Sequence, residues 1–226
     1  MKKWDLVLLL EWKAIVIGAT GATGKDLVKQ LLEDKDFGQV DVFVRRKMDC
    51  THPKLNVHIV DFEAIDTWQG DIRGDVLFSM LGTTLKQAGS QKKQWRVDYD
   101  YQYEVARAAR ENGVHTLELM SSVGASPRSV FFYSRMKGAL EEAVKDLSFP
   151  RTIIVRPPSL IRKETDRPGE RISVSVLQFF NRLGLLKGLA PMPTEVVAEA
   201  MIRTSKDKTA GLRVIEAGGM FELCKE

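Results

Sequence analysis

The sequence predicts one doubly wound α/β domain, in which helices cover both faces of a mostly parallel sheet. Three observations favour this fold class. Short apolar runs alternate with amphipathic stretches, the runs are apolar at nearly every position, and no repeat, low-complexity tract or Pro/Gly-rich linker interrupts them. Such alternation is typical of parallel strands joined by crossover helices. Continuous apolar runs fit strands that are buried on both faces.

Seven short runs have the composition of strands, and four longer stretches have the apolar spacing of helices. The predicted strands are residues 14–17, 40–44, 57–60, 76–81, 116–120, 152–156 and 212–215. The predicted helices are residues 25–33, 94–112, 134–147 and 194–204. Residues 157–193 are irregular and rich in proline, with one amphipathic stretch at 172–183. We expect this segment to form a small C-terminal substrate lobe, because loops at the carboxyl edge of such sheets build the ligand site.

The composition excludes several classes of protein. A chain of 226 residues suits a single domain, and 44% apolar with 28% charged residues is a globular balance. The 34 basic and 30 acidic residues leave a net charge of +4, a weak footprint for nucleic-acid binding even at a pI near 9.0. No apolar run reaches the roughly 18 residues that span a bilayer. We therefore expect neither nucleic acid nor a membrane as a partner.

The N-terminus and the cysteines bear on the compartment. The apolar run at residues 6–10 is shorter than the roughly 7–15 residues of an export signal, so residues 1–12 are interpreted as an N-terminal extension. The two cysteines, Cys50 and Cys224, are too few for a disulfide framework and suit a reducing compartment. These features lead us to expect a cytoplasmic protein.

A glycine-rich turn follows the first strand and leads directly into the first helix. Its residues are Gly18, Ala19, Thr20, Gly21, Ala22, Thr23 and Gly24. Glycines at this spacing allow a tight turn, close backbone approach to a pyrophosphate and close packing of helix on strand. The N–H groups at the helix N-terminus then face the phosphates. The pattern predicts dinucleotide binding by the six residues other than Ala19; a glycine-rich turn without a ligand is the alternative.

The end of the second strand indicates which dinucleotide is bound. An acidic residue there binds the ribose 2′-hydroxyl of NAD, whereas arginine accommodates the 2′-phosphate of NADP. Asp41 has the usual distance from Gly21, but it precedes the end of the strand. Arg45, Arg46 and Lys47 stand at the carboxyl end. We therefore expect Arg45 and Arg46 to bind NADP(H) in preference to NAD(H).

Two later strand ends add candidates for the cofactor site. Asp61 follows the third strand and is a candidate for the adenine end of the cofactor. Leu81, Gly82 and Thr83 close the fourth strand, where the backbone is expected to pass near the cofactor.

Tyr133 and Lys137 lie four residues apart, on one face of a predicted helix. A phenol with an ordinary pKa of about 10 needs help to exchange a proton near neutral pH, and a neighbouring ammonium group favours the phenolate. Ser121 and Ser122 end the preceding strand, where a hydroxyl could polarise a substrate carbonyl. A surface Tyr–Lys pair is the alternative, but its place behind the dinucleotide turn favours a hydride-transfer site.

Taken together, these features resemble the short-chain dehydrogenase/reductase superfamily, which has a Rossmann sheet. The G-x-x-G-x-x-G spacing is similar to that of its extended and atypical branches. Four further segments resemble the atypical group that contains the Tat-interacting oxidoreductase: DVLFSMLGTT at 75–84, RVDYDY at 96–101, Arg156-Pro157 and RPGE at 167–170. The resemblance covers roughly residues 13 to 217.

The resemblance implies NADP binding and assigns roles to individual residues. Tyr133 and Lys137 match the catalytic pair, and Ser121 or Ser122, with Ser122 preferred, matches the catalytic serine. Lys137 and Pro157 are implied to lie beside the cofactor. Asp98 stands where many extended members carry asparagine, so the proton relay behind the lysine departs from the family pattern. Some members of the group act in cofactor-dependent regulation instead of turnover.

The first hypothesis is therefore hydride transfer between NADPH and a carbonyl or alcohol substrate, with Tyr133 as the general acid. The alternative is a non-catalytic module that senses NADPH and binds a regulatory partner. A sugar-nucleotide epimerase or dehydratase is the lesser alternative, because 226 residues leave little room for a large substrate domain. The apolar side chains of Phe179 and Phe180 are interpreted as part of a cap over the cofactor or, equally, as the face of a homodimer.

The remaining charged and metal-binding residue types give weaker signals. Lys86, Lys92, Lys93 and Arg96 form a basic cluster after the fourth strand, interpreted as a solvated surface or as a site for an anionic substrate or partner. The three histidines, at positions 52, 58 and 115, do not have the spacing of metal ligands, so no metal is expected.

Overall fold

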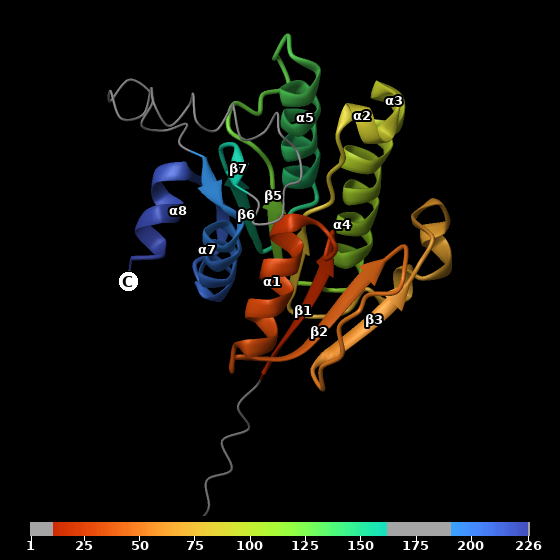
Figure 1. Ribbon diagram of the computed structural model, residues 1–226, viewed down its shortest axis with the longest axis vertical. Coiled ribbons are helices and arrows are strands. Elements are labelled where there is room, and N and C mark those ends of the chain that lie inside the picture. The colour runs from red at the N-terminus through yellow and green to blue at the C-terminus, as the bar shows by residue number, and fades with distance from the viewer. Residues whose placement is uncertain (1–10, 162–190, 226) are drawn as a thin grey trace, which may run out of the picture.

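The computed structural model describes residues 11–161 and 191–225, and it confirms the expected α/β Rossmann fold (Figure 1). In these residues seven parallel strands form one sheet in the order β3-β2-β1-β4-β5-β6-β9. The strands are β1 (Trp12–Ile17), β2 (Phe37–Val44), β3 (Leu55–Ile59), β4 (Val76–Ser79), β5 (Thr116–Met120), β6 (Arg151–Arg156) and β9 (Gly211–Glu216). Each overlaps a predicted strand. The strand order reverses between β1 and β4, the point at which sheets of this kind bind ligands.

Helices cover both faces of this sheet. They are α1 (Ala22–Glu33), α2 (Leu85–Ala88), α3 (Gln91–Trp95), α4 (Tyr101–Glu111), α5 (Phe132–Asp146), α7 (Thr194–Lys206) and α8 (Ala217–Leu223), with 3₁₀ turns at Phe62–Thr67 and Gln69–Asp71. α1 and α7 pack together on one face, while α4 and α5 pack on the other (Figure 1).

Two differences from the predicted helices lie beside the site. The single helix expected at 94–112 is divided into α3, a π turn at Arg96–Asp100 and α4. Apolar spacing continues through this π turn, so periodicity alone does not reveal it. α1 begins at Ala22 instead of residue 25, which places Gly24 inside its first turn.

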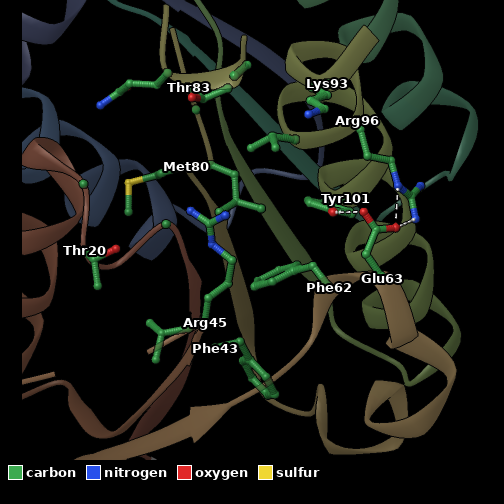
Figure 2. Close-up of a pocket in the computed structure, with 18 residues that line it drawn as sticks. Thr20, Phe43, Arg45, Phe62, Glu63, Met80, Thr83, Lys93, Arg96 and Tyr101 are labelled. Carbon is green, nitrogen blue, oxygen red and sulfur yellow. Dashed lines mark hydrogen bonds and ion pairs between the residues drawn. The ribbon is translucent and has the colours of Figure 1, made fainter. Parts of the chain in front are cut away.

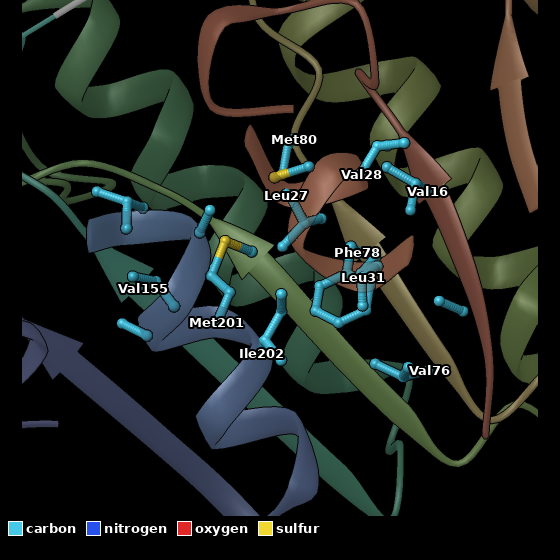
Figure 3. Packing of buried hydrophobic residues seen from close by; sticks show 14 of the residues in the cluster. Val16, Leu27, Val28, Leu31, Val76, Phe78, Met80, Val155, Met201 and Ile202 are labelled. Atoms are coloured by element: carbon cyan, nitrogen blue, oxygen red, sulfur yellow. The ribbon is translucent and has the colours of Figure 1, made fainter. Parts of the chain in front are cut away.

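Side chains alternate between two apolar layers along each central strand. In β1, Ala14 and Val16 point toward α1 and α7, whereas Ile15 and Ile17 point toward α4 and α5. Figure 3 shows the first layer, where Leu27 and Leu31 of α1 lie over the sheet near Phe78 and where Met201 of α7 packs. This burial of both faces explains why the strands are apolar throughout, and it fixes the strand ends that carry the site.

Part of the predicted lobe is outside the described residues. A short pair, β7 (Leu160–Ile161) with β8 (Met192–Pro193), is described. The stretch at 172–183, the RPGE segment, Phe179 and Phe180 lie outside the described part of the chain, as do residues 1–10 of the predicted N-terminal extension.

Candidate active site

The glycine-rich turn brings three backbone segments into direct contact. Gly18 has a φ of +86°, and a Cβ atom there would lie 2.4 Å from the carbonyl oxygen of Met80. A Cβ atom on Gly24 would lie 2.1 Å from the carbonyl oxygen of Gly18. Glycine is therefore required at both positions, at the first to meet the end of β4 and at the second to bring α1 against the turn. Gly21 precedes α1, and no side chain caps the helix N–H groups.

A cavity of about 560 Å³ opens at the carboxyl edge of the sheet beside this turn (Figure 2). Seven of the predicted cofactor residues line it: Gly18, Thr20, Gly21, Arg45, Leu81, Gly82 and Thr83. Ala22, Thr23 and Gly24 form the first turn of α1 next to the cavity. Of the other predicted cofactor residues, Arg46, Asp61, Lys137 and Pro157 are absent from its lining. The predicted residues thus converge from the ends of β1, β2 and β4, as ligand residues do in doubly wound sheets.

The acidic residue at the usual distance from the glycines does not face the cavity. Asp41 is buried within β2, where its carboxylate pairs with the Lys13 ammonium at 2.7 Å and accepts hydrogen bonds from Gln39 and Asn56, both at 2.8 Å. Burial alone would raise the pKa of Asp41, but these partners hold it below its ordinary value. At the end of β2, Arg45 stands on the cavity wall instead, so the strand end carries positive charge.

Asp61 uses its carboxylate locally. Its Oδ1 accepts the Glu63 backbone N–H at 2.9 Å and so caps the turn that follows β3. Phe62 and Glu63 line the cavity in its place. The sequence points to this strand end, and the cap determines which of its side chains reach the cavity.

Three residues that the sequence does not connect form a polar network on the cavity wall. The Tyr101 hydroxyl donates to Glu63 Oε1, and Arg96 donates to Glu63 Oε2 at 3.0 and 3.1 Å (Figure 2). Arg96 also donates to Glu104 at 2.6 Å. Burial and the Glu63 carboxylate raise the pKa of Tyr101 to about 12. Arg96 is therefore engaged with carboxylates, and of the predicted basic cluster only Lys93 and Arg96 line the cavity.

The predicted Tyr–Lys pair lies on α5, one helical turn apart. Tyr133 is 42% exposed, whereas Lys137 is only 3% exposed and donates to the Met120 carbonyl oxygen at 3.3 Å. A buried ammonium group at the end of β5 is costly unless it is paired or solvated by ligands. The helix thus holds a buried positive charge one turn from an accessible phenol.

The two serines after β5 have different surroundings. Ser121 donates to Glu141 Oε1 at 2.5 Å, and Arg156 holds the same carboxylate at 2.5 and 3.0 Å. Ser122 Oγ is buried and makes no hydrogen bond within the described residues. Ser122 is therefore the serine with a free hydroxyl. Pro157 accepts the Val123 N–H at 3.0 Å, which ties the end of β6 to the loop that carries Ser122.

Asp98 holds the loop after β4 and lies within electrostatic reach of Lys137. It is 1% exposed, and its Oδ2 accepts the Thr83 N–H at 2.8 Å. Its Oδ1 has no partner among the described residues. Burial raises the pKa of Asp98 to about 6, while attraction to the Lys137 ammonium and the Thr83 hydrogen bond oppose this rise. The carboxyl group is thus poised to change its charge near neutral pH, close to Lys137.

Residues 11–161 and 191–225 contain no group of three or more His, Cys, Asp or Glu side chains arranged to hold a metal ion. No helix in the same residues is long and apolar enough to cross a bilayer.

Comparison with known proteins identifies the class. A model of the NAD(P)H-binding family matches residues 18–208, so the chain belongs to this family. Within it, the chain is 33% identical over 219 residues to the protein HTATIP2 of Rattus norvegicus, covering 93% of this chain and 88% of the relative. It is also 33% identical to the mitochondrial protein FMP52 of Eremothecium gossypii, over 94% of this chain and 97% of the relative.

Solved structures show the same fold at low sequence identity. MoeE5 in complex with UDP-glucuronic acid and NAD has a TM-score of 0.69 and 17% identity, over 89% of this chain and 75% of that chain. The UDP-glucose 4-epimerase of Thermotoga maritima with UDP-glucose has a TM-score of 0.67 and 14% identity, over 91% and 77%. These likenesses confirm the Rossmann fold, and the HTATIP2 relationship confirms the expected group.

The expected cytoplasmic location is wrong. The FMP52 relatives from several fungi, 33–35% identical to this chain, are named mitochondrial proteins. The expectation rested on the small number of cysteines and the short apolar run near the N-terminus. Neither feature distinguishes the cytoplasm from the other compartments of a cell.

Proposed function

We propose that this chain is an NADP(H)-dependent oxidoreductase of the short-chain dehydrogenase/reductase type, acting on a carbonyl or alcohol substrate. The observation that carries the proposal is the Lys137 ammonium, buried beside Asp98 and one helical turn from the accessible Tyr133. The free, buried Ser122 hydroxyl supports it, because an unpaired hydroxyl suits a site that a ligand completes.

The residues present fit the cofactor. Gly18 and Gly24 leave no room for side chains where a pyrophosphate approaches, and the first N–H groups of α1 are free for phosphate oxygens. Arg45 supplies positive charge at the end of β2, where a 2′-phosphate is recognised. When bound, NADP(H) supplies or accepts the hydride.

The chain's own residues then handle the proton and the carbonyl. Tyr133 donates its hydroxyl proton to the carbonyl oxygen as the general acid. Lys137 stabilises the resulting phenolate, and the Ser122 hydroxyl donates a hydrogen bond to the same oxygen. Asp98 holds the loop at Thr83 and offsets the charge of Lys137.

The decisive test compares Tyr133→Phe with Tyr103→Phe, a control on α4 that stacks on Tyr99. Carbonyl reduction by NADPH is measured on a panel of aldehydes, ketones and quinones, together with the Kd for NADPH. We expect Tyr133→Phe to lower kcat at least about 100-fold with little change in Kd, because only the proton donor is lost. Full activity in this variant contradicts the mechanism.

A second candidate function, NADPH-dependent binding of a protein partner, has one observation in its favour. Val130 and Phe131, which directly precede α5, are 84% and 73% exposed. Neighbouring exposed apolar side chains suit a binding surface. Tight NADPH binding without turnover on any carbonyl favours this alternative. Because the FMP52 relatives are mitochondrial, we propose the same compartment for this chain.

A further inference from the structure

Lys93 adds a second free cation to the cavity, on a different wall from Arg45. Arg45 reaches in from the end of β2, while Lys93 projects from α3 on the side of Tyr101 and Arg96 (Figure 2). Across residues 11–161 and 191–225, neither the Lys93 ammonium nor the Arg45 guanidinium takes part in a hydrogen bond or an ion pair. Both charges are therefore available to a ligand.

The third cation of the wall is already compensated. Arg96 pairs with Glu63 at 3.0 Å, Glu104 at 2.6 Å and Asp100 at 3.6 Å. The Glu63 carboxylate accepts hydrogen bonds from Arg96 and Tyr101, so the negative charge of Glu63 is offset as well. The uncompensated charge among the described lining residues is that of Arg45 and Lys93. A phosphate monoester carries −1.5 to −2 at neutral pH and matches this pair.

Local contacts hold α3, the helix that carries Lys93, beside the cavity. Ser90 Oγ accepts the Lys93 backbone N–H at 3.2 Å and starts α3. Gln94, which is buried, donates to the Thr83 carbonyl oxygen at 3.1 Å and ties α3 to the loop after β4. Lys92 is equally exposed but does not line the cavity. The two adjacent lysines thus differ in position and not in charge.

We propose that Lys93 binds the 2′-phosphate of NADP(H) together with Arg45, so that two separate segments determine the preference over NAD(H). The proposal rests on the proposed function and assigns the phosphate site to the pair Arg45–Lys93. An ammonium and a guanidinium that line one cavity from different elements can bind a dianion by charge-assisted hydrogen bonds. The cavity mouth is open to solvent, so salt screens this attraction in part.

The test uses the full chain and calorimetric titration of the wild type, Lys93→Ala, Lys92→Ala and Arg45→Ala. The probes are NADPH, NADH, adenosine 2′,5′-bisphosphate and 5′-AMP. We expect Lys93→Ala to raise the Kd for NADPH and for the bisphosphate about tenfold. The Kd values for NADH and 5′-AMP should stay within about twofold of the wild type. Lys92→Ala is expected to leave all four within about twofold, because its charge lies outside the cavity. Arg45→Ala should show the pattern of Lys93→Ala.

Each other outcome overturns the inference, and the outcomes separate it from the proposed function. If Lys93→Ala weakens the binding of NADPH and NADH equally, the lysine contacts a part of the dinucleotide that both cofactors share. Equal effects of Lys92→Ala and Lys93→Ala reduce the role to general surface charge. A wild type that binds NADH as well as NADPH removes 2′-phosphate recognition but keeps the dinucleotide site. A wild type that binds neither cofactor overturns the proposed function as well.

Discussion

The two halves of the site are built in different ways. The nucleotide half, around the turn between β1 and α1, is shaped by backbone: Gly18 and Gly24 contribute no side chain and touch main-chain atoms of the turn and of the end of β4. The chemistry half, after β5, is shaped by side chains: Lys137 donates to Met120 at the end of β5, Asp98 accepts from Thr83 in the loop after β4, and the Ser122 hydroxyl has no partner among the described residues.

Because of this difference, substitutions in one half of the site can affect turnover without affecting cofactor binding. Backbone contacts in the nucleotide half also hold α1 against the sheet, so a change there affects folding and binding together. The polar side chains of the chemistry half are not members of the two apolar core clusters. A substitution there can remove one chemical role and leave the fold in place.

The largest expected effect is that of Gly24→Ala in the nucleotide half. The new Cβ atom would lie 2.1 Å from the Gly18 carbonyl oxygen, and a backbone atom at that distance cannot move aside cheaply. We expect the free energy of unfolding to fall by about 3 kcal/mol and NADPH affinity to fall with it. Urea denaturation and NADPH titration measure the two losses.

The matched control for this comparison is Gly70→Ala, where nothing lies within 4 Å of the new Cβ atom. It is expected to change stability by less than about 0.5 kcal/mol and binding not at all. If Gly24→Ala keeps full stability and NADPH binding, the nucleotide half is not shaped by its backbone contacts.

A smaller effect separates the two serines of the chemistry half. Ser122→Ala removes the free hydroxyl and should lower kcat/KM for a carbonyl about 100-fold at almost unchanged stability. Ser121→Ala leaves Glu141 Oε1 without its 2.5 Å hydrogen bond, and the free energy of unfolding should fall by about 1–2 kcal/mol. Steady-state kinetics and urea denaturation of both variants give the pattern, and its reversal assigns the chemistry to Ser121.

The sequence predicts the fold well because strand burial leaves a direct record in composition. Each of the seven apolar runs became a strand of the sheet, since both faces of every central strand are covered. The turn at Gly18 was equally predictable, because only glycine meets the backbone contacts that it requires.

The finer choices within the site depend on contacts between residues far apart in the chain. Ser121 differs from Ser122 because the Glu141 carboxylate, on α5, accepts a hydrogen bond from the Ser121 hydroxyl. Arg45 and Arg46 both follow the end of β2, but only Arg45 lines the cavity. Lys93 lines the cavity and Lys92 does not, because adjacent residues of α3 point in different directions and Gln94 ties this helix to Thr83. Such distinctions are set by tertiary packing, which local spacing does not encode.

The smallest expected effect concerns Asp98, whose buried carboxylate lowers the stability of the folded protein at neutral pH. Its pKa rises from the ordinary 3.8 to about 6 because the carboxyl group is buried, so the folded protein favours the protonated form. The resulting stabilisation is complete below about pH 3.8 and is lost as the pH rises through about 6. Asp98→Asn cannot ionise, keeps an acceptor for the Thr83 N–H and should therefore be more stable than the wild type by about 1–2 kcal/mol at pH 8.

The pH dependence of this gain distinguishes ionisation from packing. Urea denaturation at pH 4 and pH 8 should show the gain of Asp98→Asn only at the higher pH, while kcat/KM falls because Lys137 loses its neighbouring carboxylate. Asp100→Asn, on the same π turn but half-exposed near Arg96, serves as the control and should show no gain. An equal gain at both pH values attributes the effect to packing, and a gain without loss of turnover separates Asp98 from the chemistry of Lys137. Loss of stability at pH 8 shows instead that the ionised carboxylate supports the fold through Lys137.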